Sequence, residues 1–262
     1  MSALDLNDQA QNMRAFFKAR ASLDGADAVT WFSGSVSAMI PGEPWRGPLF
    51  GFEGFNVARA VEIDGGYELL SREAAFYLDP RSRAVLRTWT NPFTQTDREV
   101  VHVWNDPVNF RFTAQGPRGP FMVPWREAGG RVFFLSDVFL AYPSPLPRAE
   151  FPESSQNDTY QAAELFGFTC ARADLEDGAP SAPATISWTR IAPWLPFMGM
   201  ADRPGQLVYH CEGLKLGSFD ELPGWIRDEV AAHGEQFAHA PETWSEPSET
   251  SWTYFKKLAT RA

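Results

Sequence analysis

The fold is decided by residues 72–109, which read REAAFYLDPRSRAVLRTWTNPFTQTDREVVHVWNDPVN. Runs of β-branched and aromatic residues alternate here with polar residues, which is the pattern of strands with one face in a core. Proline next to aspartate or asparagine gives turn signals at 79–82, 91–98 and 105–107. The stretch therefore predicts three or four consecutive strands. In the last of these, residues 99–104, His102 and Trp104 fall on one face.

The same alternation continues on both sides of this stretch. It predicts further strands at 28–40, 67–78, 110–113, 121–125, 131–140, 160–170, 184–191 and 206–213. Helices are expected only near the ends, at 5–20 with Asp5 or Asn7 as N-cap, and within 220–260, where Gly234 ends the first C-terminal helix. The chain is therefore predicted to be mainly β, with a large antiparallel, strongly curved sheet or a barrel and flanking terminal helices.

Length and composition limit the classes of protein that fit. A chain of 262 residues suits one large β domain or two smaller ones, and we expect a single β-rich domain over 1–262. The net charge is −10 and basic residues do not cluster, so nucleic-acid binding is not expected. No signal peptide or membrane-spanning run is found, so we expect a cytoplasmic protein. The sequence is compatible with assembly into a homo-oligomer.

Aromatic residues are abundant, with ten tryptophans and 21 phenylalanines. They fit either the core of a β protein or a pocket for a flat, aromatic ligand. The glycines at 47, 51 and 54 match neither a phosphate loop nor a dinucleotide fingerprint, and they are expected to mark bulges or close backbone approach. Cys170 and Cys211 lack zinc spacing, and they are either a disulfide or two buried thiols in a reducing compartment.

The candidate catalytic residues are histidines in strands. Of the four histidines, His102 and His210 fall within predicted strands, beside Trp104 and Tyr209. Imidazole titrates near neutral pH, so the two rings would form a general acid–base pair if both strands face one interior. The alternative is that each is an ordinary core or surface histidine. No third ligand stands at a suitable spacing, so no metal site is expected.

Other side chains would bind the substrate or stabilise charge. Arg203, in a proline-rich, lid-like loop, and Lys215 are candidate clamps for a carboxylate or phenolate, and Tyr209 is a candidate hydroxyl donor. The remaining candidates are aromatic or polar residues that would line the interior: Trp31, Tyr77, Trp89, Asn91, Trp104, Trp125 and Tyr142. Each is equally compatible with a structural role.

Several long segments resemble a bacterial family known as domain of unknown function 1838. They include PLFGFEGFN (48–56), REAAFYLDPRSRAVLRTWTNPFT (72–94), VVHVWNDPVNF (100–110) and PWLPFMGMADRPGQLVYHCEGLKL (193–216). The resemblance extends from about residue 4 to residue 230. It implies a link to bacteria that degrade lignin-derived aromatic dimers.

The activity that the resemblance implies is a cofactor-independent lyase step. A phenylcoumaran-type dimer would be converted to a stilbene, with carbon–carbon bond cleavage, ring opening and release of formaldehyde or carbon dioxide. A small aromatic substrate is then the expected partner, and no cofactor is needed. The alternative is a non-catalytic carrier of a hydrophobic aromatic ligand.

Overall fold

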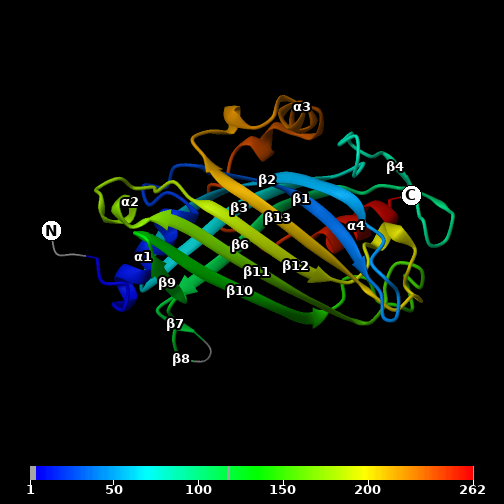
Figure 1. Cartoon of the computed structure of the whole chain (residues 1–262), viewed down its shortest axis with the longest axis horizontal. Helices are drawn as coiled ribbons and strands as arrows, with labels where there is room; N and C mark the ends of the chain where they lie inside the picture. Colours follow the sequence, from blue (N-terminus) through cyan, green and yellow to red (C-terminus); the bar gives the residue numbers. More distant parts are fainter. Residues whose placement is uncertain (1–3, 117–118, 262) are drawn as a thin grey trace.

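The computed structural model describes residues 4–116 and 119–261. Its main feature is a nine-stranded sheet, in which every neighbouring pair of strands is antiparallel (Figure 1). In spatial order the strands are β6 (Val103–Thr113), β3 (Gly66–Leu78), β2 (Pro48–Ile63), β1 (Ala28–Met39), β13 (Gln206–Leu216), β12 (Thr185–Ala192), β11 (Thr159–Ala171), β10 (Arg131–Pro143) and β9 (Trp125–Ala128). The sheet curls into a half-barrel with β6 and β9 as its edge strands, which confirms the predicted mainly β, curved antiparallel fold.

The sheet is assembled from two halves of the chain. The first half supplies β1, β2, β3 and β6, and the second supplies β9 to β13 as a continuous meander. The halves join at the centre, where β1 pairs with β13 from Val29 opposite Leu216 to Met39 opposite Gln206. Two small hairpins lie outside the main sheet, β4 (Thr88–Thr90) with β5 (Asp97–Glu99), and β7 (Gln115–Gly116) with β8 (Gly119–Pro120).

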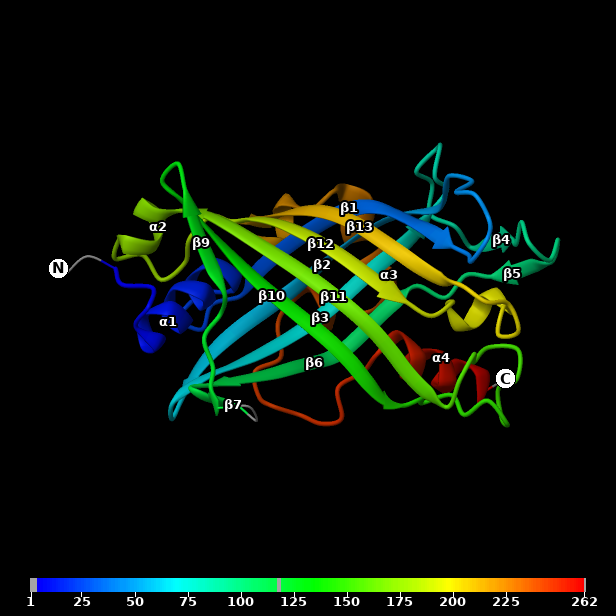
Figure 2. The ribbon, with the colours of Figure 1, turned by 60° about the horizontal axis from the view of Figure 1, so that its bottom comes forward.

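Helices close the ends and cover part of the outside. They are α1 (Gln9–Arg20), α2 (Arg172–Glu176), α3 (Gly224–His233) and α4 (Ser251–Ala259), with short 3-10 turns η1 (Pro196–Met198), η2 (Phe219–Glu221) and η3 (Glu235–Ala238). The helix α1 lies at one end of the half-barrel and α4 at the opposite end (Figure 2). The expected N- and C-terminal helices are therefore present.

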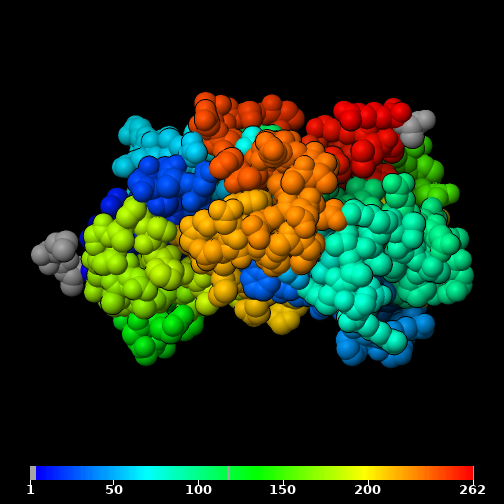
Figure 3. Space-filling model, turned by 90° about the horizontal axis from the view of Figure 1, so that it is seen from above, coloured from blue at the N-terminus to red at the C-terminus, as the bar shows by residue number. Residues whose placement is uncertain are grey.

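The alternation of side chains along each strand produces a concave and a convex face. The concave face carries two clusters of buried hydrophobic residues, one around Phe50 and Phe52 and one around α1. On the convex face, Phe55 and Val57 pack with Ile226 of α3 in a third cluster. The space-filling view shows α3, in orange, lying across this convex side (Figure 3).

The helix α1 closes its end of the half-barrel with two phenylalanine side chains. Phe16 meets the rings of Phe134 and Phe168 edge-on, at 5.8 and 5.5 Å between ring centroids. The helix begins after Asp8, whose side chain accepts a hydrogen bond from the backbone N–H of Gln11. The predicted caps, Asp5 or Asn7, are therefore wrong by three residues or by one.

The stretch 72–109 contains the last part of β3, all of β4 and β5, and the start of β6, but the predicted strand at 99–104 is wrong, since residues 100–102 lie between β5 and β6. The turn at 79–82 is present, with Asp79 accepting from the backbone N–H of Ser82. The residues that follow form the separate β4–β5 hairpin, so β3 pairs directly with β6. The predicted turn at 105–107 is wrong, because Pro107 lies inside β6. Proline is tolerated there, since β6 is an edge strand and needs fewer N–H donors.

The structure also tests the predicted strand at 121–125, the glycines and the cysteines. The predicted strand at 121–125 is wrong, since only Trp125 belongs to a strand. Gly54 allows the predicted close approach, because a Cβ there would lie 2.3 Å from the carbonyl oxygen of Ala74. Cys170 and Cys211 are both free and buried, and they belong to different clusters. None of the helices in the described ranges is long and apolar enough to cross a membrane.

Candidate functional site

The two candidate histidines do not share a pocket. Tyr209 faces the concave side together with Leu207 and Cys211, so the next residue, His210, points to the convex side and is exposed. His102 precedes β6 and is only 7% exposed. The predicted acid–base pair therefore does not form. The sequence pattern failed because His210 occupies the outward phase of β13 and His102 lies outside the strand.

His102 has a structural environment. Its Nδ1 accepts a hydrogen bond from the backbone N–H of Tyr77 at 3.2 Å, and its buried Nε2 has no partner among the described residues. Burial, with the Arg87 guanidinium adding to it, lowers the pKa of His102 to about 4. The ring is therefore neutral at physiological pH, and its hydrogen bond holds the segment before β6 against β3.

Several other predicted site residues lie away from the middle of the concave face. Trp31 and Trp104 belong to the convex cluster, where Trp104 stacks on His233 of α3 at 3.8 Å between centroids. Arg203 forms an ion pair with Glu43 in the loops. Trp89 belongs to the cluster around Phe50 and Phe52, and Asn91 donates to the carbonyl of Met198 at the same end. Trp125 packs against the other cluster, around α1.

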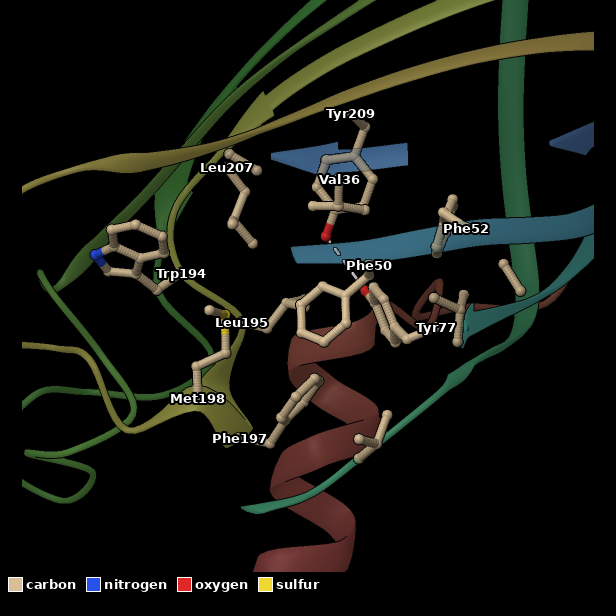
Figure 4. Close-up of a cluster of buried hydrophobic side chains, with 14 of the residues drawn as sticks. Val36, Phe50, Phe52, Tyr77, Trp194, Leu195, Phe197, Met198, Leu207 and Tyr209 are labelled. Carbon is tan, nitrogen blue, oxygen red and sulfur yellow. Dashed lines mark hydrogen bonds between the residues drawn. The ribbon is translucent and has the colours of Figure 1, made fainter. Parts of the chain in front are cut away.

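Three predicted tyrosines lie on the concave face. Tyr77 and Tyr209 point toward one another from β3 and β13, with their hydroxyl oxygens 3.2 Å apart (Figure 4). Burial raises the pKa of Tyr209 to about 12 and that of Tyr77 well above its ordinary value, so both phenols stay protonated, and one donates the hydrogen bond that the other accepts. Tyr142 stands at the rim, with its ring 5.0 Å from that of Tyr160.

Beside the tyrosines lies a charged pair that the sequence interpretation did not single out. Arg190 of β12 faces Glu164 of β11 across the sheet, with a nitrogen–oxygen distance of 3.5 Å, and it donates to the hydroxyl of Tyr160 at 2.6 Å. Burial disfavours the charged form, but the Tyr160 oxygen and the Glu164 carboxylate hold the pKa of Arg190 above its ordinary value. Arg190 is therefore a permanent cation on the concave face.

The pair retains access to solvent although it lies between two closed clusters. The Arg190 side chain is 18% exposed and that of Glu164 is 19% exposed, whereas Trp194 and Phe134 in the flanking clusters are almost completely buried. Two donors are nevertheless buried without a partner among the described residues, the Arg190 Nε and the Trp188 Nε1. Unsatisfied donors of this kind are rare in proteins and commonly mark a place that water or a ligand fills.

Glu73 of β3 is the most perturbed acid in this region. It lies on the same face as Tyr77, and its carboxyl has no hydrogen-bond partner among the described residues. Burial and the neighbouring Glu164 carboxylate raise the pKa of Glu73 to about 7, against the opposing effect of Arg190 and Arg20. A carboxyl group with a pKa near neutrality is able to give and to take a proton at physiological pH.

Two further cations stand on the concave side near α1. Arg20, the last residue of α1, donates to the side-chain oxygen of Asn56 at 3.2 Å, and its guanidinium lies over the ring of Phe168. Lys215 of β13 donates to the backbone carbonyls of Lys18, at 2.9 Å, and Ala21. Lys215, predicted as a clamp, thus has an observed role in holding the C-terminal end of α1.

A separate groove of about 560 Å³ lies on the surface between α1 and α2. Its buried cation, Lys18, is satisfied by the carboxylate of Asp177 at 2.5 Å and by the carbonyls of Asp174 and Asp177. The other lining residues include the exposed Arg14 and Glu176, and none of those described is a buried acid or base, so the groove offers less chemistry than the concave face. Within 4–116 and 119–261, no group of three or more metal-ligating side chains is placed to hold a metal ion.

The sequence did contain a signal for the residues that were missed. Glu164 and Arg190 each occupy the inward phase of a strand whose other inward residues are apolar or aromatic, and Glu73 occupies the inward phase of β3, where Ser71 is also polar. A charged residue in that phase must be paired or functional, because an isolated charge is costly to bury. In each strand, the residues at alternate positions from a buried aromatic residue lie on the same face. Following those positions would have selected these three residues.

Together, the fold and the site define a class of protein: an open antiparallel half-barrel whose concave face holds ionisable groups between two aromatic clusters. The chain belongs to the family described as protein of unknown function (DUF1838), whose model matches residues 25–259. No curated protein matches the chain.

Proposed function

We propose that this protein is an enzyme that acts on a small aromatic compound by proton transfer at the concave face, with Glu73 as the acid–base group. One observation carries the proposal: an inward carboxyl without a protein partner whose pKa is raised to about 7. Perturbed acids beside a fixed cation are typical of active sites. Glu73 takes the role that the sequence had suggested for His102 and His210.

Aromatic rings beside the charged pair suit a flat substrate. Trp188 stands next to Arg190 on the inward face of β12, with Phe166 stacked at 6.0 Å and Phe32 edge-on at 5.7 Å between ring centroids. Phe32 and Phe166 keep part of their surface accessible. Apolar and aromatic walls with a few convergent polar groups are the usual composition of a small-molecule site.

The reaction we propose is the lyase step that the family resemblance implies. The Glu73 carboxylate takes the proton of the substrate's primary hydroxyl, and the carbon–carbon bond to that carbon breaks to release formaldehyde. The electron pair of the broken bond forms the stilbene double bond, while the carbon–oxygen bond of the five-membered ring breaks to leave a phenoxide. The phenoxide then takes a proton. Substrate and products balance without an oxidant or a reductant.

The remaining residues of the concave face would serve the leaving phenoxide. Tyr77 and Tyr209 are protonated donors, and Arg190 is a permanent cation held by Glu164. Donors fixed in place before the reaction stabilise developing negative charge, because they need not reorganise during the step. The proton finally delivered to the phenoxide is the one that Glu73 removed, so the carboxylate is regenerated.

The test is turnover of a phenylcoumaran-type dimer, followed by mass analysis of the stilbene and by detection of formaldehyde. Glu73→Gln should lower kcat by roughly 10²- to 10⁴-fold, which is the usual contribution of a general acid–base group. Glu62→Gln, in the exposed part of β2, is the matched control and should keep full activity. Unchanged turnover in Glu73→Gln would refute the assignment of Glu73.

A second candidate is a non-catalytic carrier of the same ligands. The unpartnered Nε of Arg190 and Nε1 of Trp188 favour it, because a bound ligand would satisfy both donors without reacting. A carrier would bind the dimer with a measurable Kd and release it unchanged. Product analysis after prolonged incubation therefore separates the carrier from the lyase.

The free thiols bear on where the protein works. Cys170 and Cys211 are buried and unbonded, which agrees with a reducing compartment, and we propose a cytoplasmic location on this basis. Fractionation of cells that express the protein, with detection by antibody, tests the location directly.

A further inference from the structure

Arg20 and Lys215 place two positive charges on the concave side, where the Glu73 carboxyl acts on Arg20 from beyond ion-pair distance. Neither cation has an acidic side chain within ion-pair distance among the described residues. Burial lowers the pKa of Arg20 to about 10. Burial and the nearby positive charge of Arg20 lower the pKa of Lys215 to about 8. The region is therefore electropositive, although the chain as a whole has a net charge of −10.

The two cations differ in what occupies their donors. The ammonium of Lys215 is taken up by the carbonyls of Lys18 and Ala21 at the end of α1. The guanidinium of Arg20 has five N–H donors, and a single side-chain hydrogen bond, to Asn56, is formed within the described residues. Most of the Arg20 fork is thus available to a ligand.

The Arg20 fork is also held in place. Its partner Asn56 is buried, and the Asn56 amide donates to the backbone carbonyl of Arg72 at 3.2 Å, which fixes the orientation of the amide oxygen toward Arg20. Asn56 lies directly opposite Glu73 in the register of β2 and β3. The guanidinium therefore stands beside the proposed acid–base group, with the ring of Phe168 beneath it at 5.7 Å.

We propose that Arg20 binds a carboxylate carried by the aromatic ligand of the concave face and anchors the ligand beside Glu73. The inference rests on the proposed function for the location of the ligand, but it does not require turnover. A carboxylate fits because its two oxygens match the planar fork of a guanidinium. The aromatic part of the same ligand would then extend over the rings between α1 and Arg190.

The anchored carboxylate is not the group that the reaction releases. A guanidinium stabilises a carboxylate in the ground state, and loss of carbon dioxide would remove the charge that the guanidinium binds. The anchored carboxylate therefore stays on the product. For the proposed lyase step this favours release of formaldehyde over release of carbon dioxide.

Isothermal titration calorimetry with two probes of the same shape tests the anchor. The probes are naphthalene-2-carboxylate and naphthalene-2-carboxamide, titrated into the full chain at pH 6. The wild-type protein should bind the carboxylate roughly 10- to 100-fold more tightly than the amide, the range expected for hydrogen bonds to a charged group. Arg20→Gln should abolish this preference, and Arg20→Lys should keep only part of it, because lysine retains the charge but not the fork.

Arg14→Gln is the matched control, since Arg14 lies on the same helix but is exposed beside the groove between α1 and α2. It should keep the full preference. The proposal is overturned if wild type shows no preference for the carboxylate, if Arg20→Gln retains it, or if Arg14→Gln loses it. If Arg20→Gln does not fold, the test uses Arg20→Lys. An unchanged preference for the carboxylate probe in Arg20→Lys refutes binding by the guanidinium fork.

The outcome is separable from the lyase proposal. Glu73→Gln should keep the preference for the carboxylate probe, because the anchor does not depend on proton transfer. Loss of catalysis without loss of the anchor, or the reverse, therefore shows which of the two proposals fails.

Discussion

The raised pKa of Glu73 predicts an unusual dependence of stability on pH. The unfolded chain ionises this carboxyl at its ordinary pKa of 4.5, whereas the folded protein keeps it protonated up to about pH 7. Between these values the folded state binds more protons than the unfolded state, so stability falls as pH rises. Above about pH 7 both states are ionised and the loss is complete.

The magnitude follows from the size of the shift. A change from 4.5 to about 7 corresponds to about 3 kcal/mol of free energy of unfolding, at about 1.36 kcal/mol for each pH unit. Glu73→Gln removes the ionisable group and keeps the side-chain shape. The stability of the variant relative to wild type should therefore increase by about 3 kcal/mol between pH 4.5 and pH 8.

Urea denaturation, followed by tryptophan fluorescence at pH 5, 6, 7 and 8, measures this difference. Other titrating groups, such as His102 and Lys215, are present in both proteins and cancel in the comparison. Glu62→Gln is the control, because the exposed Glu62 carboxyl is solvated in both states. Parallel curves for wild type and Glu73→Gln would refute the reasoning and with it the raised pKa on which the proposed function depends.

The charged pair, the tyrosine pair and the outward histidine give three further predictions. Arg190→Gln should lower the free energy of unfolding by about 3 kcal/mol, because it leaves Glu164 without its counter-charge, and adding Glu164→Gln should restore part of the loss in the same urea experiment. Tyr77→Phe should cost about 1 kcal/mol in that assay, since it removes the hydrogen bond to Tyr209 and keeps the ring; no loss would mean that water replaces the bond. His210→Ala should leave turnover unchanged and alter stability by less than about 0.5 kcal/mol, because the side chain is exposed on the convex face. Lost turnover in this variant would return His210 to the site.

The class of fold was predictable because strand alternation is a local property. The alternating stretches predict most strands of the sheet, and Gly234 does follow the end of α3. The failures are also physical. Pro107 suggested a turn, but an edge strand tolerates a missing donor, and the pairing of β3 with β6 around the β4–β5 hairpin depends on contacts distant in sequence.

The site was less predictable, because it depends on which face of each strand turns inward. Residue type alone selected His210 and Trp104, and both lie on the convex face. The inward phase of Tyr209 and Tyr77 was the informative signal, since Arg190 lies directly opposite Tyr209 in the register and Glu73 shares the face of Tyr77. Burial inside the half-barrel raises the pKa of Glu73 most, and Glu164, 91 positions later in the chain, raises it further; no local pattern reports either effect.

The joint between β1 and β13 has a consequence for how the proposed site is assembled. Glu73 comes from the first half of the chain, whereas Glu164 and Arg190 come from the second, and only the central joint brings them together. Neither half alone carries the complete group of residues, because a fragment that ends before β9 lacks both Glu164 and Arg190 even if its own strands fold. Pairings between segments distant in sequence form slowly during folding. The pKa of Glu73 therefore rises only once the two halves have docked.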